Sequence, residues 1–243
     1  MTIIDKIKNV KWIVVGLFYV LACGLTYLLI QFPNLIQKIW TRLFNFDPNF
    51  NWNHGIALLF ASFLAYRIFK IERKTTLLGN KPLYSLIFAS IFLIAYSILG
   101  FNNDFGINPH LWAFIFCLAT LFYDFLEESA WRGFLQDCLK PIPFWLKGII
   151  TGMFWGFWHL LIFNNFDQFG GIHIFVLLSI VVSIIMAYAT KKTNSILVAS
   201  SIHALMILRN INVTIICIAI WVILIIIWNR KNKKNGTKTA YST

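Results

Sequence analysis

Long apolar runs separated by short polar segments dominate the pattern of the chain. A membrane-spanning helix needs about 20 mainly apolar residues, or fewer where neighbouring helices cover its ends. Eight runs of the sequence meet this requirement and predict eight spanning helices. We place them at about residues 12–30, 54–71, 83–100, 111–128, 148–163, 172–190, 195–209 and 211–229. The pattern therefore predicts an all-α, polytopic integral membrane helix bundle.

Composition and charge support this prediction and orient it. Hydrophobic residues make up 59% of the 243 residues and charged residues only 12%, against roughly 25% charged in a soluble domain, which excludes a soluble fold. Lys and Arg collect on the cytoplasmic side of short loops. With the N-terminus inside, all 21 of them except Lys38, Arg42 and Arg209 lie in the cytoplasmic segments. Both termini are therefore predicted to be cytoplasmic, and the net charge of +12 is explained by topology rather than by nucleic-acid binding.

The same pattern predicts the domain organisation. Residues 1–229 read as a single transmembrane domain of catalytic type, whose motifs fall at about residues 120–210, and residues 230–243 read as a basic, disordered cytoplasmic tail. The two halves of the chain show no internal repeat of the kind that builds many transporters. A transporter is therefore a weaker hypothesis than an enzyme or a binding protein.

Ionisable residues inside membrane spans are costly and are candidates for function. In this chain they are few. They comprise an acidic cluster with one arginine at the end of the fourth run, and two isolated histidines in later runs: Asp124, Glu127, Glu128, Arg132, His159 and His203. Three further histidines, His54, His110 and His173, stand at the ends of runs and are predicted to be interfacial.

Helical spacing assigns different roles to the two adjacent glutamates. Glu128 and Arg132 are four residues apart on one helical face, in the order that favours an ion pair. Glu127 lies about 100° round the helix and is free to face the bundle interior and act as a general base. Asp124, one turn earlier, could share the arginine or repel the pair. The alternative is that the whole cluster is interfacial charge at the lipid boundary.

One carboxylate and two imidazoles around a polar cavity favour hydrolysis. Glu127, His159 and His203 could hold a metal ion such as zinc with an open position for water. Without a metal, Glu127 and one histidine would take the water proton while the other histidine stabilises the oxyanion. A span ending at residue 128 puts Glu127 at its inner end, whereas His159 lies about 11 residues inside its own span. A shared site then requires a tilted or oblique helix.

At these residues the sequence resembles the CPBP intramembrane endopeptidases, the family of CAAX proteases and bacteriocin-processing enzymes also called Abi. The family motif EExxxR is matched at Glu127, Glu128 and Arg132, followed by Gly133. An aromatic residue four positions before a histidine is matched at 155–159, and a histidine in a helix beginning Ser-Ile-Leu is matched at 195–203.

The resemblance implies a role for each matched residue. Glu127 would be the base, Glu128 and Arg132 its supporting pair, and His159 and His203 ligands or oxyanion groups. Family members are described both as metalloproteases and as metal-independent glutamate-type enzymes. One departure stands out, because the third motif commonly continues HxxxN and this chain has Ile207 at that position. Asn210 lies on about the same helical face one turn later.

Two functional hypotheses follow. The first is an intramembrane endopeptidase of a prokaryotic cell membrane that cleaves a membrane-associated peptide or protein near the cytoplasmic face, as in bacteriocin or pheromone maturation or in self-immunity. The second is a non-catalytic membrane scaffold or immunity protein of the same fold that binds a partner, which Ile207 favours. The lipid bilayer is a partner in both, and the sequence gives no oligomeric state.

Overall fold

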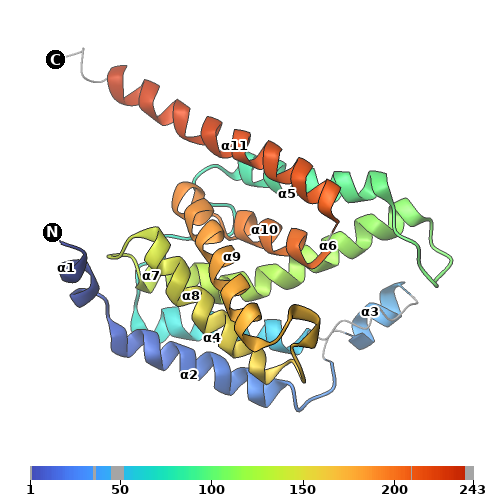
Figure 1. The fold of residues 1–243 in the computed structure, drawn as a ribbon, viewed down its shortest axis with the longest axis horizontal. Helices are drawn as coiled ribbons and strands as arrows, with labels where there is room; N and C mark the ends of the chain where they lie inside the picture. Colours follow the sequence, from blue (N-terminus) through green and yellow to red (C-terminus); the bar gives the residue numbers. More distant parts are fainter. Residues whose placement is uncertain (1, 35–36, 45–51, 209, 239–243) are drawn as a thin grey trace. The chain divides into compact units, whose positions relative to one another are not determined.

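A computed structural model describes residues 2–34, 37–44, 52–208 and 210–238, which are mostly helical (Figure 1). These residues contain no β-sheet, only an isolated parallel bridge between Thr76 and Ser195. The helical elements are α1 (Ile3–Lys8), α2 (Trp12–Leu29), α3 (Gln37–Phe44), α4 (Asn53–Phe69), α5 (Pro82–Leu99), α6 (Pro109–Glu128), η1 (Ser129–Leu135), α7 (Gln136–Cys138), α8 (Phe144–Trp158), η2 (His159–Leu161), η3 (Asp167–Phe169), α9 (Ile172–Thr193), α10 (Ile196–Leu208) and α11 (Ile211–Lys238).

The predicted all-α class is confirmed, and each of the eight apolar runs coincides with a helix. Within the described part of the chain, five helices are long and apolar enough to cross a membrane. They are α2, α5, the continuous run from α6 to α7, α9, and the Ile211–Trp228 part of α11. The helices α4, α8 and α10 are shorter, with 17, 15 and 13 residues.

Two predicted boundaries differ from the structure. The fourth run was predicted to end at residue 128, but α6 passes at Glu128 directly into the π-helical segment η1 and then into α7, giving one helix of 30 residues from Pro109 to Cys138. The helix continues past Arg132 because the charge of this residue is paired inside the protein. A paired charge allows the helix to remain in apolar surroundings. At the other end of the chain, α11 continues to Lys238, past the point at Arg230 where we expected a disordered tail to begin.

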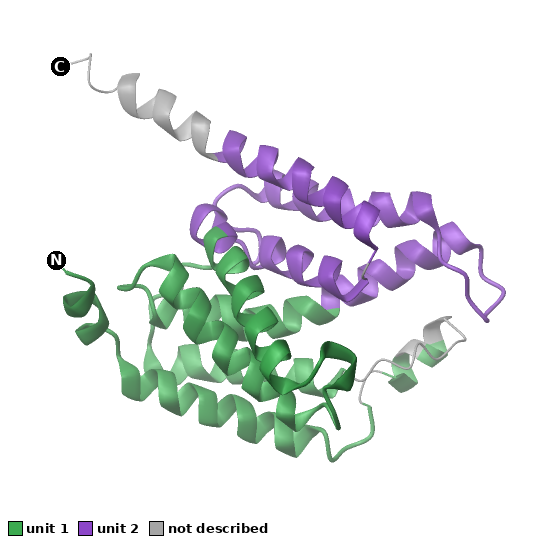
Figure 2. Ribbon diagram, viewed as in Figure 1, with its two compact units in different colours: residues 1–75, 123–188 green, residues 76–122, 189–243 purple. Residues whose placement is uncertain are grey.

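The chain divides into two compact units, which Figure 2 shows in different colours, and the first contains residues 1–75 and 123–188. In this unit α2 packs along α4, and η1 packs against both helices. Aromatic side chains fill the contact, since the ring centre of Phe18 lies 4.6 Å from that of Phe134 and 6.3 Å from that of Trp131. The buried indole N–H of Trp158 donates to the hydroxyl of Thr26 at 2.9 Å, so these two polar groups of the apolar core satisfy each other.

Glycines spaced four residues apart let α8 and α9 approach closely within the same unit. A Cβ atom added to Gly148 would stand 2.4 Å from the Cα of Ile184, and one added to Gly152 would stand 2.5 Å from the Cα of Ile180. Side chains at these positions would therefore collide with the backbone of α9. Small residues at this spacing are typical of tightly packed membrane helices. These glycines hold α9, which carries Ser183, close to α8.

The second unit contains residues 76–122 and 189–243. In it α5 packs against α10 and α11. The ring of Phe88 stacks on Trp221 with centroids 4.4 Å apart, and the Trp221 indole donates to the Phe88 carbonyl at 2.9 Å. Further along α11, the indole N–H of Trp228 donates to the side-chain oxygen of Asn80 at 2.8 Å. Buried tryptophans with satisfied N–H groups therefore hold the helices of this unit together.

Candidate active site

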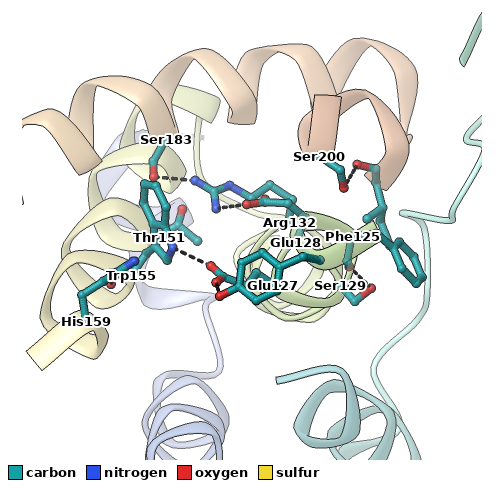
Figure 3. A network of polar contacts seen from close by, with 12 residues as sticks. Phe125, Glu127, Glu128, Ser129, Arg132, Thr151, Trp155, His159, Ser183 and Ser200 are labelled. Carbon is teal, nitrogen blue, oxygen red and sulfur yellow. Dashed lines mark hydrogen bonds and ion pairs between the residues drawn. The ribbon is translucent and has the colours of Figure 1, made fainter. Parts of the chain in front are cut away.

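The glutamate and arginine predicted to pair do so deep inside the first unit. Arg132 Nη1 lies 2.9 Å from Glu128 Oε1, and the two side chains are 1% and 0% exposed. The other terminal nitrogen, Nη2, donates to the hydroxyl of Ser183 on α9 at 2.6 Å. Figure 3 shows this chain of contacts from α9 through Arg132 to Glu128. A buried ion pair is stable only when further hydrogen bonds satisfy its atoms, and Ser183 provides one.

The carboxylate of Glu127 is held separately from this pair. Its Oε1 atom accepts a hydrogen bond from the hydroxyl of Tyr123, one turn earlier on α6. Its Oε2 atom accepts from the indole N–H of Trp155 on α8 at 3.0 Å (Figure 3). Glu127 is 1% exposed. Two donors pointing at the two oxygens favour a carboxylate that accepts at both, which is the form a general base needs before reaction.

Trp155 connects the two glutamates. Its indole N–H bonds Glu127, while its ring lies 5.2 Å from the guanidinium carbon of Arg132, within the range of a cation–π contact. Through Arg132 the tryptophan is therefore linked to Glu128 as well. Replacing the ring or the arginine would disturb both carboxylates.

His159 lies at the end of α8, among aromatic rings. Its Nδ1 atom is 2.7 Å from the Trp155 carbonyl oxygen. A carbonyl oxygen only accepts hydrogen bonds, so Nδ1 carries the proton and Nε2 of the neutral ring is left as an acceptor. The rings of Trp158 and Phe175 pack against the imidazole at 5.0 and 4.8 Å. This packing fixes the ring plane and leaves Nε2 as the nitrogen able to take a proton.

Burial rules out the interfacial-charge interpretation of the acidic cluster. Asp124 and Glu128 are 0% exposed and Glu127 and Arg132 are 1% exposed. The extension of the helix to Cys138 also places Glu127 well inside its helix rather than at its end.

His203 belongs to the second unit. It lies on α10 and is 5% exposed. Ile207, at the position where the family commonly has asparagine, is 42% exposed. The side-chain oxygen of Asn210 does not replace that asparagine. It caps α11, where Oδ1 accepts a hydrogen bond from the N–H of Val213 at 3.1 Å. Of the five candidate residues, the structure thus brings Glu127, Glu128, Arg132 and His159 together in one unit.

Several residues of this site were missed by the sequence analysis. They are Tyr123, the indole donor of Trp155, and Ser183. His54, predicted to be interfacial, packs against the rings of Tyr123 and Trp158 at 5.3 and 5.8 Å. Tyr123 carried a usable signal, since it stands four residues before Glu127. Ser183 carried none, because nothing local relates it to Arg132.

A metal ion needs more ligands than the described residues provide at one place. Among them, no three His, Cys, Asp or Glu side chains are arranged to hold a metal ion. Zinc takes four ligands in structural sites and three protein ligands plus water in catalytic ones. In the first unit, both oxygens of Glu127 already accept hydrogen bonds. The described residues therefore show no preformed metal site, and the mechanism that we propose takes no step through a metal.

Comparison with known proteins gives a family match that covers the candidate residues. Residues 108–208 match the family model described as type II CAAX prenyl endopeptidase Rce1-like. The chain carries an Rce1-like domain. This match confirms the resemblance to the CPBP endopeptidases, and all five candidate residues lie inside the Rce1-like domain. Searches of curated proteins and of solved structures gave no match.

The Rce1-like domain sets the coarse class of the protein. Its family is one of CAAX-type proteases, so the domain supports protease activity. Combined with the long apolar helices, it identifies an integral, multi-pass membrane protein.

Proposed function

We propose that this protein is an intramembrane endopeptidase that hydrolyses a peptide bond of a membrane-associated peptide or protein near the cytoplasmic face. One observation carries the proposal. Within the Rce1-like domain, each oxygen of the buried Glu127 carboxylate accepts a hydrogen bond, and one of the donors is Trp155 on α8, the helix whose C-cap is His159. A carboxylate fixed in this way is suited to take a proton from water.

In the mechanism we propose, Glu127 and His159 activate one water molecule. The water loses a proton to Glu127, and its oxygen forms a bond to the carbonyl carbon of the substrate. His203 stabilises the resulting oxyanion. The proton then passes to the leaving nitrogen as the C–N bond breaks, which yields a carboxylate and an amine. Glu128 and Arg132 support this step by fixing Trp155, which holds the base.

The proposed topology has eight spans and both termini in the cytoplasm. Helices at all eight apolar runs support the number, and the short helices α4, α8 and α10 require neighbouring helices to cover their ends. The distribution of Lys and Arg supports the orientation. Reporter fusions after α2, α5 and α9 test it, because fusion points on opposite faces give opposite signals.

The biological roles that we propose are maturation of secreted peptides, such as bacteriocins or pheromones, and self-immunity in a prokaryotic cell. The decisive assay co-expresses candidate membrane peptides with wild-type protein or with Glu127→Ala, His159→Ala or His203→Ala. We expect cleavage to be lost in all three variants and retained in Glu72→Ala, whose side chain is exposed. Undiminished cleavage in Glu127→Ala would overturn the proposal.

A non-catalytic scaffold or immunity protein is the second candidate, and Ile207 is the observation that favours it. This side chain cannot hydrogen bond to a substrate, and the side-chain oxygen of Asn210 is engaged in capping α11. A scaffold requires only that partner binding or protection survive Glu127→Ala. Measured protection against a peptide toxin, in cells carrying that variant, separates the two functions.

A zinc-dependent form of the mechanism makes a different prediction from the metal-free form. Purified protein washed with chelator would keep one zinc ion per chain and lose it in His159→Ala if zinc is a ligand-bound cofactor. In the metal-free form that we propose, the washed protein contains no stoichiometric zinc and keeps its activity. Elemental analysis of the two proteins decides between these forms.

A further inference from the structure

We propose that Tyr123 is a positioning residue for Glu127, and that its hydroxyl changes from donor to acceptor when Glu127 takes up a proton. The proposal rests on the proposed function, because it takes Glu127 as the base. Tyr123 lies outside the EExxxR motif and was not singled out by the sequence. Its assignment comes from the hydrogen bond that its hydroxyl donates to Glu127 Oε1.

The position of Tyr123 on α6 makes this contact a local one. Residues four apart in an α-helix are neighbours on one face. Tyr123 and Glu127 both precede the π-helical segment η1, which begins at Ser129, so normal α-helical spacing holds between them. The phenol therefore reaches the carboxylate of the next turn without any bend of the helix.

Neighbouring side chains hold the ring of Tyr123 in place. The ring of Trp52 lies 6.1 Å away at an interplanar angle of 84°, and the ring of His54 lies 5.3 Å away at 73°. Gly55 allows α4 to pass close by, because a Cβ added there would stand 3.3 Å from Tyr123 Cε2. Edge-to-face packing on these sides leaves the ring little freedom to turn. The hydroxyl is thus aimed at Glu127 by the fold and not by the hydrogen bond alone.

The two donors at Glu127 differ in what they can do after proton transfer. The indole N–H of Trp155 is a donor only, whereas the hydroxyl of a tyrosine can donate or accept. Oε2 therefore has to remain an acceptor to keep its bond to Trp155. Oε1 can become a donor, because the phenol facing it can rotate its hydrogen away and accept. The two oxygens of one carboxylate are in this way assigned to different tasks.

The proton transfer balances on these atoms. The O–H bond of water breaks, its proton bonds to Oε1 of Glu127, and the electron pair stays on the water oxygen that attacks the substrate. The new O–H of Glu127 then donates to Tyr123, so that both hydrogen bonds of the carboxyl group are kept throughout. When the proton moves on to the leaving amine, Tyr123 donates to Oε1 again.

The test compares Tyr123→Phe with Tyr66→Phe in the full-length protein in liposomes. Both changes remove one phenol hydroxyl that bonds a carboxylate, since Tyr66 donates to Asp137 at 2.8 Å, and both keep the ring. The probe is an internally quenched peptide that ends in a farnesylated CAAX sequence. We expect Tyr123→Phe to lower kcat by about 10- to 100-fold, the loss of one hydrogen bond to a charged group, with little change in KM. Tyr66→Phe should leave kcat unchanged.

Two further measurements separate the possible failures. Wild-type kcat in Tyr123→Phe, together with loss of activity in Glu127→Ala, overturns the role of Tyr123 and leaves the proposed function standing. Full activity in Glu127→Ala overturns both. The infrared band of the Glu127 carboxylate, identified by its absence in Glu127→Gln, needs no substrate. It should shift in Tyr123→Phe and stay in place in Tyr66→Phe, and an unshifted band in Tyr123→Phe contradicts the proposal directly.

Discussion

The guanidinium carbon of Arg132 lies 5.2 Å from the ring centre of Trp155, whose indole N–H holds Glu127. This relationship explains how a motif of two adjacent glutamates and one arginine can act as a unit, although only one glutamate touches the arginine. Arg132 pairs directly with Glu128 and acts on Glu127 through the tryptophan. The aromatic residue four positions before His159 is thus a link between the first and second motifs.

The indole donor of Trp155 can be tested without removing its ring. Trp155→Phe keeps a smaller aromatic face towards Arg132 and deletes the hydrogen bond to Glu127. We expect proteolytic activity to fall by about 10- to 100-fold, because a hydrogen bond to a charged group is lost. Trp221→Phe is the matched control in the second unit, since its buried indole bonds the Phe88 carbonyl instead. Equal losses of kcat in the two variants would argue for a general packing defect.

Removal of Arg132 should destabilise the protein strongly. Arg132→Ala leaves the charge of Glu128 buried without its ion-pair partner, and breaking one side of a buried pair costs about 3–5 kcal/mol. Arg132→Lys should recover only part of this, because one ammonium group does not reproduce the geometry of the guanidinium that contacts both Glu128 and Ser183. Reversible unfolding in mixed detergent measures the difference.

An exposed ion pair provides the control for Arg132. Lys140 lies 3.0 Å from Glu72, with 52% and 70% of the two side chains exposed. Its hydrogen bond lowers the pKa of the Glu72 carboxyl, so the pair is charged at neutral pH. Pairs of this kind contribute little to stability. Lys140→Ala should therefore have the same free energy of unfolding as the wild type. A loss of stability as large as that of Arg132→Ala would contradict our account of burial.

The glycine stripe of α8 gives a prediction about packing. Gly152→Ala places a Cβ 2.5 Å from the Cα of Ile180, so α9 must move away. We expect a loss of about 1–3 kcal/mol, as for other overpacked cores, together with reduced activity, because α9 carries the serine that bonds Arg132. Gly16→Ala is the control, since nothing lies within 4 Å of its added Cβ. Unchanged stability of Gly152→Ala would show that α8 and α9 are not in close contact.

Asp137 anchors the segment after α4 in a way that limited proteolysis can measure. Its carboxylate accepts from the Tyr66 hydroxyl at 2.8 Å, from the backbone N–H groups of Lys74 and Thr75 at 2.9 and 3.2 Å, and from the Thr75 hydroxyl at 2.9 Å. An asparagine offers only one accepting oxygen. Asp137→Asn should therefore speed trypsin cleavage after Arg73 or Lys74 by about tenfold or more. Glu72→Gln should be cut at the wild-type rate, and an unchanged rate in Asp137→Asn would refute the anchor.

Local spacing explains what the sequence could predict. The pair of Glu128 and Arg132 followed from a separation of four residues, and the structure contains it. The same rule applies to Tyr123 and Glu127, but a tyrosine in an apolar helix is an ordinary residue, so the rule alone did not single it out. The all-α class followed from the length of the apolar runs.

Long-range contacts explain what the sequence could not predict. The fourth run was predicted to end at residue 128, before the charge of Arg132. Its partner Ser183 lies 51 residues later, and only the packing of α9 brings it near. His54 was assigned to the interface for the same reason, since its aromatic neighbours come from distant helices. The metal-ligand role of Glu127, His159 and His203 stays a prediction.

The buried charges of the helix from Pro109 to Cys138 also bear on how the chain is made. This helix is the least apolar of the five long ones, and each charged residue at its centre opposes membrane insertion by about 2.5–3.5 kcal/mol. Trp155 and Ser183, which compensate those charges, leave the ribosome after Arg132 has been synthesised. The helix thus lacks its partners when it first meets the translocon. Stable insertion of α6 therefore depends on α8 and α9 arriving in the bilayer with it, as one group.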